Sequence, residues 1–101
     1  MIDLLEQNRQ VIATLCRKYG VRKLDVFGSA ARGDFDPAES DVDLFFEFDA
    51  NPTAVADRFF GLAEDLECLL GRKVDLVSIQ DVRNPYFLQV ANQHRVSLYA
   101  A

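Results

Sequence analysis

The 101-residue sequence has little of several features that often define a class of protein. Its two cysteines, Cys16 and Cys68, lie far apart and form no CxxC pair, which argues against a thiolate zinc site and against a disulfide framework. Its apolar runs are far shorter than the roughly 20 residues that a membrane span needs, and the N-terminus lacks a signal-peptide pattern. The sequence therefore predicts a cytoplasmic protein without a membrane segment.

Basic residues are fewer than acidic ones, and histidine is rare. Lys and Arg number 11 against 16 Asp and Glu, which gives a net charge of −5. Because a basic face supplies most of the affinity of sequence-independent nucleic-acid binding, we expect no direct contact with DNA or RNA, and a basic protein partner suits this balance better. The one histidine, His94, lies near the end of the last predicted helix, where a surface or helix-terminal role is more common than that of a catalytic base.

What is present is a periodic apolar pattern, in a chain that is half hydrophobic. It predicts one domain over residues 1–101 with helices over 3–19 and 55–70 and a last helix that is capped by Asn84. Strands are expected at 21–28, 42–48, 73–79 and 96–100, a one-turn helix capped by Ser29 follows the first strand, and 34–40 is expected to be a loop. This order predicts an α+β fold, a mixed sheet of about four strands with helices packed on it.

The same pattern predicts which side chains are buried. The helix over 55–70 is expected to bury one stripe and the last helix one side, and both cysteines are expected in or near the core. On these helix faces the pattern predicts burial of Val55, Phe59, Phe87, Val90 and Ala91. Phe45 and Phe60 are expected to be further aromatic residues of the core.

Acidic side chains crowd the start of the strand at 42–48. Asp41 and Asp43 are two apart, so their side chains leave the same face of the strand. Mg²⁺ prefers one or two carboxylates plus phosphate oxygens at about 2.1 Å, and Asp75, on a neighbouring strand, is the candidate for a third ligand of a two-metal site. A calcium-binding EF-hand does not fit, because Glu39 and Phe45 stand where that loop needs glycine and glutamate. The bland alternative for Asp41 and Asp43 is a solvated loop that ends in a strand.

The remaining acidic residues of this stretch (Asp34, Asp36 and Glu39) are interpreted as polar loop residues. Upstream of them, Gly28 and Ser29 join the end of a strand to a short helix, a place where backbone N–H groups bind phosphate. Arg32 can add a charged donor one turn later. Phosphate-binding groups beside metal-binding carboxylates suit attack on a phosphorus atom with pyrophosphate as the leaving group.

These motifs, "GSAARG", the "DVD" that begins at Asp41 and the downstream "VDLV", resemble the minimal nucleotidyltransferases, the small relatives of the polymerase-β-like superfamily. The resemblance covers most of the chain and implies a nucleotidyltransferase fold. It also implies that Asp41, Asp43 and Asp75 bind magnesium, with Asp75 drawing the proton from the acceptor hydroxyl. Gly28 and Ser29 would hold the β- and γ-phosphates of ATP, with Arg32 assisting.

Stand-alone members of the resembled family commonly act as antitoxins that transfer AMP from ATP to a tyrosine of a HEPN-domain ribonuclease toxin. The resemblance therefore implies a protein adenylyltransferase with Mg²⁺ as cofactor and a HEPN-type partner. The short chain is expected to borrow its acceptor-binding surface from that partner or from its own dimer. Two alternatives stay open: transfer to a small molecule, as in aminoglycoside-modifying enzymes, and an antitoxin that neutralises by binding alone.

Overall fold

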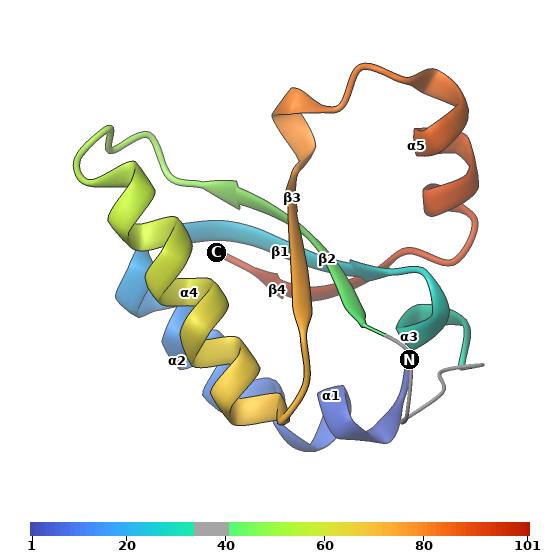
Figure 1. Ribbon diagram of the computed structural model, residues 1–101, viewed down its shortest axis with the longest axis horizontal. Helices are drawn as coiled ribbons and strands as arrows, with labels where there is room; N and C mark the ends of the chain where they lie inside the picture. Colours follow the sequence, from blue (N-terminus) through green and yellow to red (C-terminus); the bar gives the residue numbers. More distant parts are fainter. Residues whose placement is uncertain (34–40) are drawn as a thin grey trace.

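The computed structural model describes residues 1–33 and 41–101, so the predicted acidic loop with Asp34, Asp36 and Glu39 lies outside the described residues. In chain order the elements are α1 (Asp3–Gln7), α2 (Arg9–Tyr19), β1 (Val21–Phe27), α3 (Ser29–Arg32), β2 (Val42–Phe48), α4 (Val55–Leu70), β3 (Val74–Ser78), the 3₁₀ turn η1 (Ile79–Asp81), α5 (Pro85–Asn92) and β4 (Val96–Ala100). Figure 1 shows their arrangement.

The four strands form one mixed sheet in the order β3-β2-β1-β4. Strand β1 pairs antiparallel with both β2 and β4, and β2 pairs parallel with β3 (Figure 1). Because α4 is the crossover between β2 and β3, the parallel pair follows the usual strand–helix–strand arrangement. The predicted fold class, a mixed sheet of about four strands covered by helices, is confirmed.

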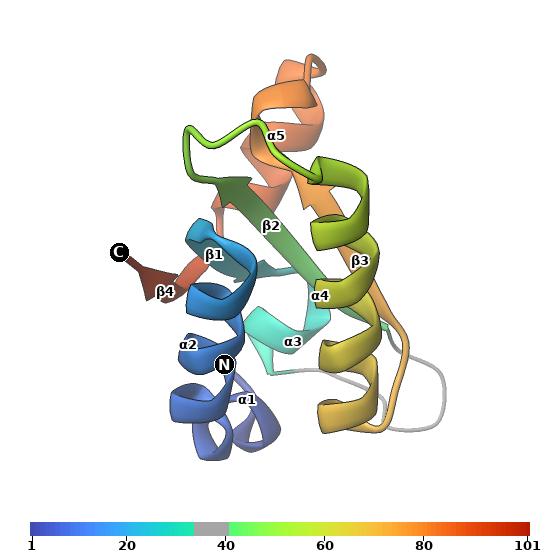
Figure 2. The same cartoon turned by 90° about the vertical axis from the view of Figure 1, so that its left-hand side faces the viewer.

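Helices α2 and α4 cover one face of the sheet (Figure 2). Alternate strand residues point to this face and meet the helix stripes in one buried cluster. Its largest fully buried members are Leu5, Ile12, Leu24, Leu44, Leu62 and Leu66. The predicted helix over 3–19 is instead two helices. They divide at Asn8, whose side-chain amide donates to the Leu4 carbonyl at 2.8 Å, and such a local bond competes with the helix backbone.

The opposite face of the sheet carries a smaller cluster beneath α5 (Figure 2). The rings of Phe27 and Phe45 stack at 4.1 Å between centroids, and Phe87 meets both edge-on. Asn84 caps α5 as predicted, since its side-chain oxygen accepts from two backbone N–H groups of the first turn. Ala91 is buried against the two stacked rings. Helix α5 therefore contacts the sheet over a short apolar surface.

Several predicted core residues are exposed, which corrects the sequence interpretation. Phe60 is 67% exposed, Phe87 38%, Val90 47% and Val55 46%. All four were expected in the core, but Phe87 reaches the sheet only edge-on, through Phe27 and Phe45, and the other three side chains keep a large exposed surface. Cys68 is also exposed, whereas Cys16 is buried and its burial raises the thiol pKa to about 12. None of the helices in residues 1–33 and 41–101 has the length and apolar character to cross a bilayer.

Candidate active site

The predicted carboxylates meet at the start of β2. Asp43 and Asp75 are direct partners in the parallel register of β2 and β3, so their side chains leave adjacent strands on the same face. Asp41 immediately precedes β2. Asp43 is partly buried, whereas Asp41 and Asp75 are exposed. The site therefore has one sheltered carboxylate flanked by two that face solvent.

The pKa of Asp43 depends on its burial and on the charged groups near it. Burial raises the pKa of Asp43, and the negative charges of Asp75 and Asp41 raise it further, while the positive charge of Arg32 opposes the shift. Both causes disfavour the ionised form of a carboxyl group. A cation between the aspartates would remove this repulsion, so the charge distribution favours cation binding at Asp43.

A glycine turn brings backbone close to the same carboxylate. Gly28 follows β1 with φ 70° and ψ −151°, a backbone conformation that is essentially restricted to glycine. A Cβ at this position would lie 2.6 Å from Oδ2 of Asp43. The turn and the carboxylate are thus in contact, and the contact depends on the missing side chain.

The cap of α3 differs from the prediction by one residue. Gly28, not Ser29, is the cap, because its carbonyl accepts from the N–H groups of both Ala31 and Arg32 at 3.1 Å. Ser29 is the first helical residue. Gly33 ends the helix with φ 93°, in the left-handed conformation that is common at helix C-termini.

A small pocket of about 160 Å³ adjoins this turn. Gly28 and Arg32 line it from one side, and Phe87 and His94 line it from the α5 side. The sequence interpretation missed the contribution of α5 and of His94, because no local motif indicates that the α5–β4 connection returns to the turn after β1. Arg95 holds that connection in place.

A buried ion pair fixes the α5–β4 connection. Asp25 on β1 is 3% exposed, and Arg95 donates to its Oδ2 through Nε at 2.6 Å. The Arg95 guanidinium also lies 4.9 Å from the Phe45 ring centroid, and Lys23 is 3.7 Å from the same carboxylate. In the sequence, the one indication of this ion pair was an aspartate on the same strand face as an apolar residue. A carboxylate that is buried in this way needs a partner.

The residues present suit magnesium only together with phosphate. Within the described residues, no group of three or more His, Cys, Asp or Glu side chains is arranged to hold a metal ion. Mg²⁺, however, is usually held by one or two carboxylates plus substrate phosphates. Asp43, with Asp41 and Asp75 close enough to raise its pKa, offers that donor set beside the Gly28 turn. The chemistry of the donors therefore fits a magnesium–nucleotide complex.

Comparison with known proteins identifies the class. A family model described as "Nucleotidyltransferase domain" matches residues 8–98. The chain belongs to this family and is an enzyme of the nucleotidyltransferase type. Its relatives include "Putative protein adenylyltransferase MJ1379" of Methanocaldococcus jannaschii, which is 37% identical over 83% of this chain and 80% of the relative.

Solved structures agree on the fold. One described as a "putative minimal nucleotidyltransferase" has a TM-score of 0.76 and 32% identity, and the match covers 94% of this chain and 95% of that chain. A second, from a complex of a tri-AMPylated Shewanella oneidensis HEPN toxin with an MNT antitoxin, has a TM-score of 0.65 and 19% identity over 96% and 73% of the two chains. The second likeness shows the fold alone. Family and fold are thus as the motifs predicted, and the roles of the individual site residues stay predictions.

Proposed function

We propose that this protein is a magnesium-dependent adenylyltransferase that transfers AMP from ATP to a tyrosine hydroxyl of a HEPN-type ribonuclease toxin, and so acts as its antitoxin. The observation that carries the proposal is the group of three aspartates around Asp43, in contact with the Gly28 turn. Such a site suits transfer at a phosphorus atom. One relative is named a putative protein adenylyltransferase, and this name supports AMP as the group transferred and a protein as the acceptor.

Each site residue has a role in this reaction. Asp41 and Asp43 hold Mg²⁺, with Asp75 as a further ligand, and the metal supplies positive charge that offsets the charge developing on the phosphates. Asp75, exposed on the neighbouring strand, accepts the proton of the acceptor hydroxyl.

The acceptor oxygen then forms a bond to the α-phosphorus, and the bond between that phosphorus and the oxygen bridging to the β-phosphate breaks. The electron pair of that bond leaves with pyrophosphate. Gly28 and Ser29 hold the β- and γ-phosphates through backbone N–H groups, and Arg32, whose charge already acts on Asp43, stabilises the leaving group.

The HEPN-type partner is supported by the charge of this chain and by a solved complex that contains a chain of the same fold. A net charge of −5 suits a basic, RNA-cleaving protein. The MNT antitoxin in the solved complex with a HEPN toxin has the same fold.

The test combines the chain with the HEPN-type product of a neighbouring gene, ATP and Mg²⁺, and weighs the partner by mass spectrometry. We expect the partner to gain AMP, and we expect Asp41→Asn and Asp43→Asn to abolish the gain, while Asp3→Asn, at an exposed position on α1, leaves it unchanged. An adduct that still forms with both site variants would refute the mechanism. Neutralisation of the toxin that survives Asp43→Asn, with no adduct from the wild type, would show an antitoxin that acts by binding. Transfer of AMP to hydroxylated small molecules alone would show the small-molecule alternative.

A further inference from the structure

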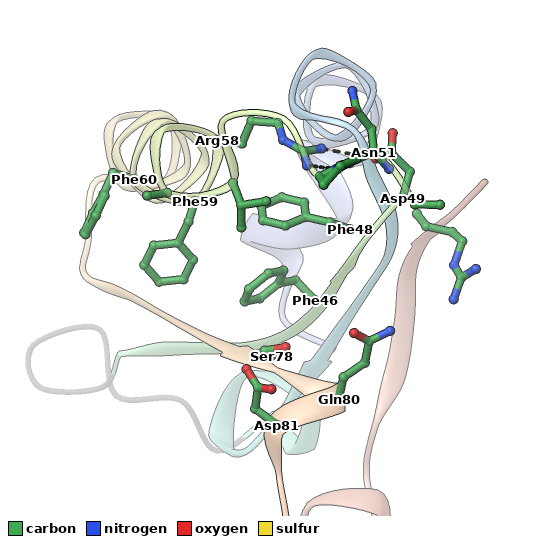
Figure 3. Close-up of a pocket in the computed structure, with 15 residues that line it drawn as sticks. Phe46, Phe48, Asp49, Asn51, Arg58, Phe59, Phe60, Ser78, Gln80 and Asp81 are labelled. Carbon is green, nitrogen blue, oxygen red and sulfur yellow. Dashed lines mark hydrogen bonds and ion pairs between the residues drawn. The ribbon is translucent and has the colours of Figure 1, made fainter.

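A groove of about 870 Å³ opens at the end of β2 that lies away from Asp43 (Figure 3). Its apolar lining comes from the end of β2 and the first turns of α4, and we call it the aromatic groove: Phe46, Phe48, Val55, Phe59 and Phe60. Ser78, Gln80 and Asp81, from β3 and η1, line it from the other side. The groove begins at Phe46 on β2, three residues and about 10 Å along the strand from Asp43.

The rings of the groove form a continuous apolar surface. Phe46 contacts Phe48 and Phe59 at 5.0 and 5.6 Å between centroids, and Phe59 contacts Phe60 at 5.3 Å. In Figure 3 the rings of Phe46, Phe48 and Phe59 point toward the same hollow, with Phe60 beyond them on α4. Phe60 and Val55 are largely exposed, so water contacts apolar surface that a bound side chain could cover.

The arginine side chains that line the groove already interact with other groups of the protein. Arg58 lies 4.5 Å from the Phe48 ring centroid and donates to Asp49 Oδ1 and to the Tyr19 carbonyl, both at 3.2 Å. Arg22 forms an ion pair with Glu47. These bonds fix the walls of the groove and neutralise its positive charges.

An acidic residue at the rim of the groove has no such partner. Asp81 lines the groove, is exposed, and forms no ion pair within the described residues. With a net charge of −5 on the whole chain, the rim attracts a positively charged segment. The groove thus combines an aromatic floor with an acidic rim.

The groove also adjoins the edge of the sheet that carries Asp75. Strand β3 is an edge strand, and Ser78 in the groove follows Asp75 by three residues, about 10 Å along the strand. The two side chains leave opposite faces of β3. A protein that covers this edge can therefore contact the groove and Asp75 together.

We propose that the aromatic groove docks the protein that receives AMP, by taking an apolar side chain from a basic segment of that protein. The proposal rests on the proposed function, because it assigns to the acceptor protein a binding surface separate from the carboxylate site. It explains why Phe60 on α4 is exposed beside the other rings of the groove. Buried aromatic anchors within a polar rim are typical of the residues that dominate the affinity of protein interfaces.

The experiment measures binding of the HEPN-type protein from the neighbouring gene to four forms of the chain by isothermal titration calorimetry. They are the wild type, Phe60→Asp, Asp81→Lys and the control Val11→Asp, which places the same charge on an exposed valine of α2. We expect Phe60→Asp to weaken binding by about 30-fold or more, as for a central anchor, and Asp81→Lys to weaken it and reduce its dependence on salt. Val11→Asp should bind as the wild type does. Circular dichroism and ATP binding should be unchanged in all three variants.

The outcomes separate this proposal from the proposed function. Loss of partner binding in Phe60→Asp without any AMP adduct in the wild type would support the groove and refute the reaction. An adduct that forms at equal rate and affinity with Phe60→Asp would refute the groove and leave the reaction standing. A wild-type dimer that Phe60→Asp converts to monomers, with partner affinity unchanged, would show that a second copy occupies the groove and would overturn the proposal.

Discussion

Replacing Gly28 with alanine adds one methyl group where the turn after β1 passes Asp43. The new Cβ would lie 2.6 Å from Oδ2 of that carboxylate, but 3.5 Å from its Cγ, so only the carboxylate oxygen must move. The backbone, with φ 70° and ψ −151°, is in a region that costs a residue other than glycine about 1–3 kcal/mol. The substitution therefore has a backbone effect on stability and a separate effect on the orientation of Asp43.

The backbone effect is expected to lower the unfolding free energy by about 1–3 kcal/mol, which for a chain of this size lowers Tm by about 5–20 °C. The matched control is Gly71→Ala. Gly71 also has a positive φ, 67°, but nothing lies within 4 Å of its added Cβ, so its cost is the left-handed backbone alone, about 1–2 kcal/mol. The two variants should thus lose similar stability by urea unfolding.

The effect on Asp43 should separate them. A displaced ligand carboxylate is expected to slow AMP transfer to the partner by about 10–100-fold in Gly28→Ala, by analogy with changes that disturb the orientation of metal ligands. Gly71→Ala should transfer at the wild-type rate at a temperature where both variants are folded. Wild-type transfer by a folded Gly28→Ala, or equal losses in the two variants, would refute the contact between the turn and Asp43.

Three further results are expected. Arg95→Met should lower the unfolding free energy by about 3 kcal/mol in urea titrations, because it leaves the buried Asp25 with a weaker partner; a loss below 1 kcal/mol would contradict the importance of the pair. The Tyr19 hydroxyl, 2.5 Å from Asp65, lowers the pKa of that carboxyl below its ordinary value of 3.8. This stabilisation is present above pH 3.8 and lost as the pH falls through the lowered pKa, so Tyr19→Phe should be less stable than the wild type at pH 7, with a gap that closes in acid. With a thiol reagent, Cys68 should react at once and the buried second thiol only after unfolding; two fast thiols would contradict the packing.

The sequence predicted the carboxylate site because strand alternation and topology determine it. Strict alternation defined β2 from Val42 to Phe48, and therefore the face of Asp43. The α4 crossover then makes β3 parallel to β2, and the register places Asp75 directly beside Asp43. A site that depends on a motif with short-range spacing and on one parallel strand pair can be predicted without knowing how distant segments pack.

The sequence could not predict what covers an apolar face. Val55 and Phe87 follow helical periodicity as well as buried residues do, yet both are exposed. Periodicity identifies the side of a helix, whereas burial depends on which element lies opposite. The aromatic groove and the contribution of His94 to the pocket beside Gly28 were missed for the same reason, since each is formed by segments that are distant in the chain.

Two carboxylates on one face of the sheet differ in the charges that surround them. Asp25 pairs in register with Phe45, and Asp43 with Phe27, so the stacked rings lie between the two acids. Asp25 is buried, and Arg95 already supplies the positive charge that offsets its carboxylate. The pKa of Asp43 is raised by burial and by the charges of Asp75 and Asp41, against the opposing charge of Arg32. This difference between the two acids supports the proposal that a metal ion binds at Asp43, beside the Gly28 turn, and not at Asp25.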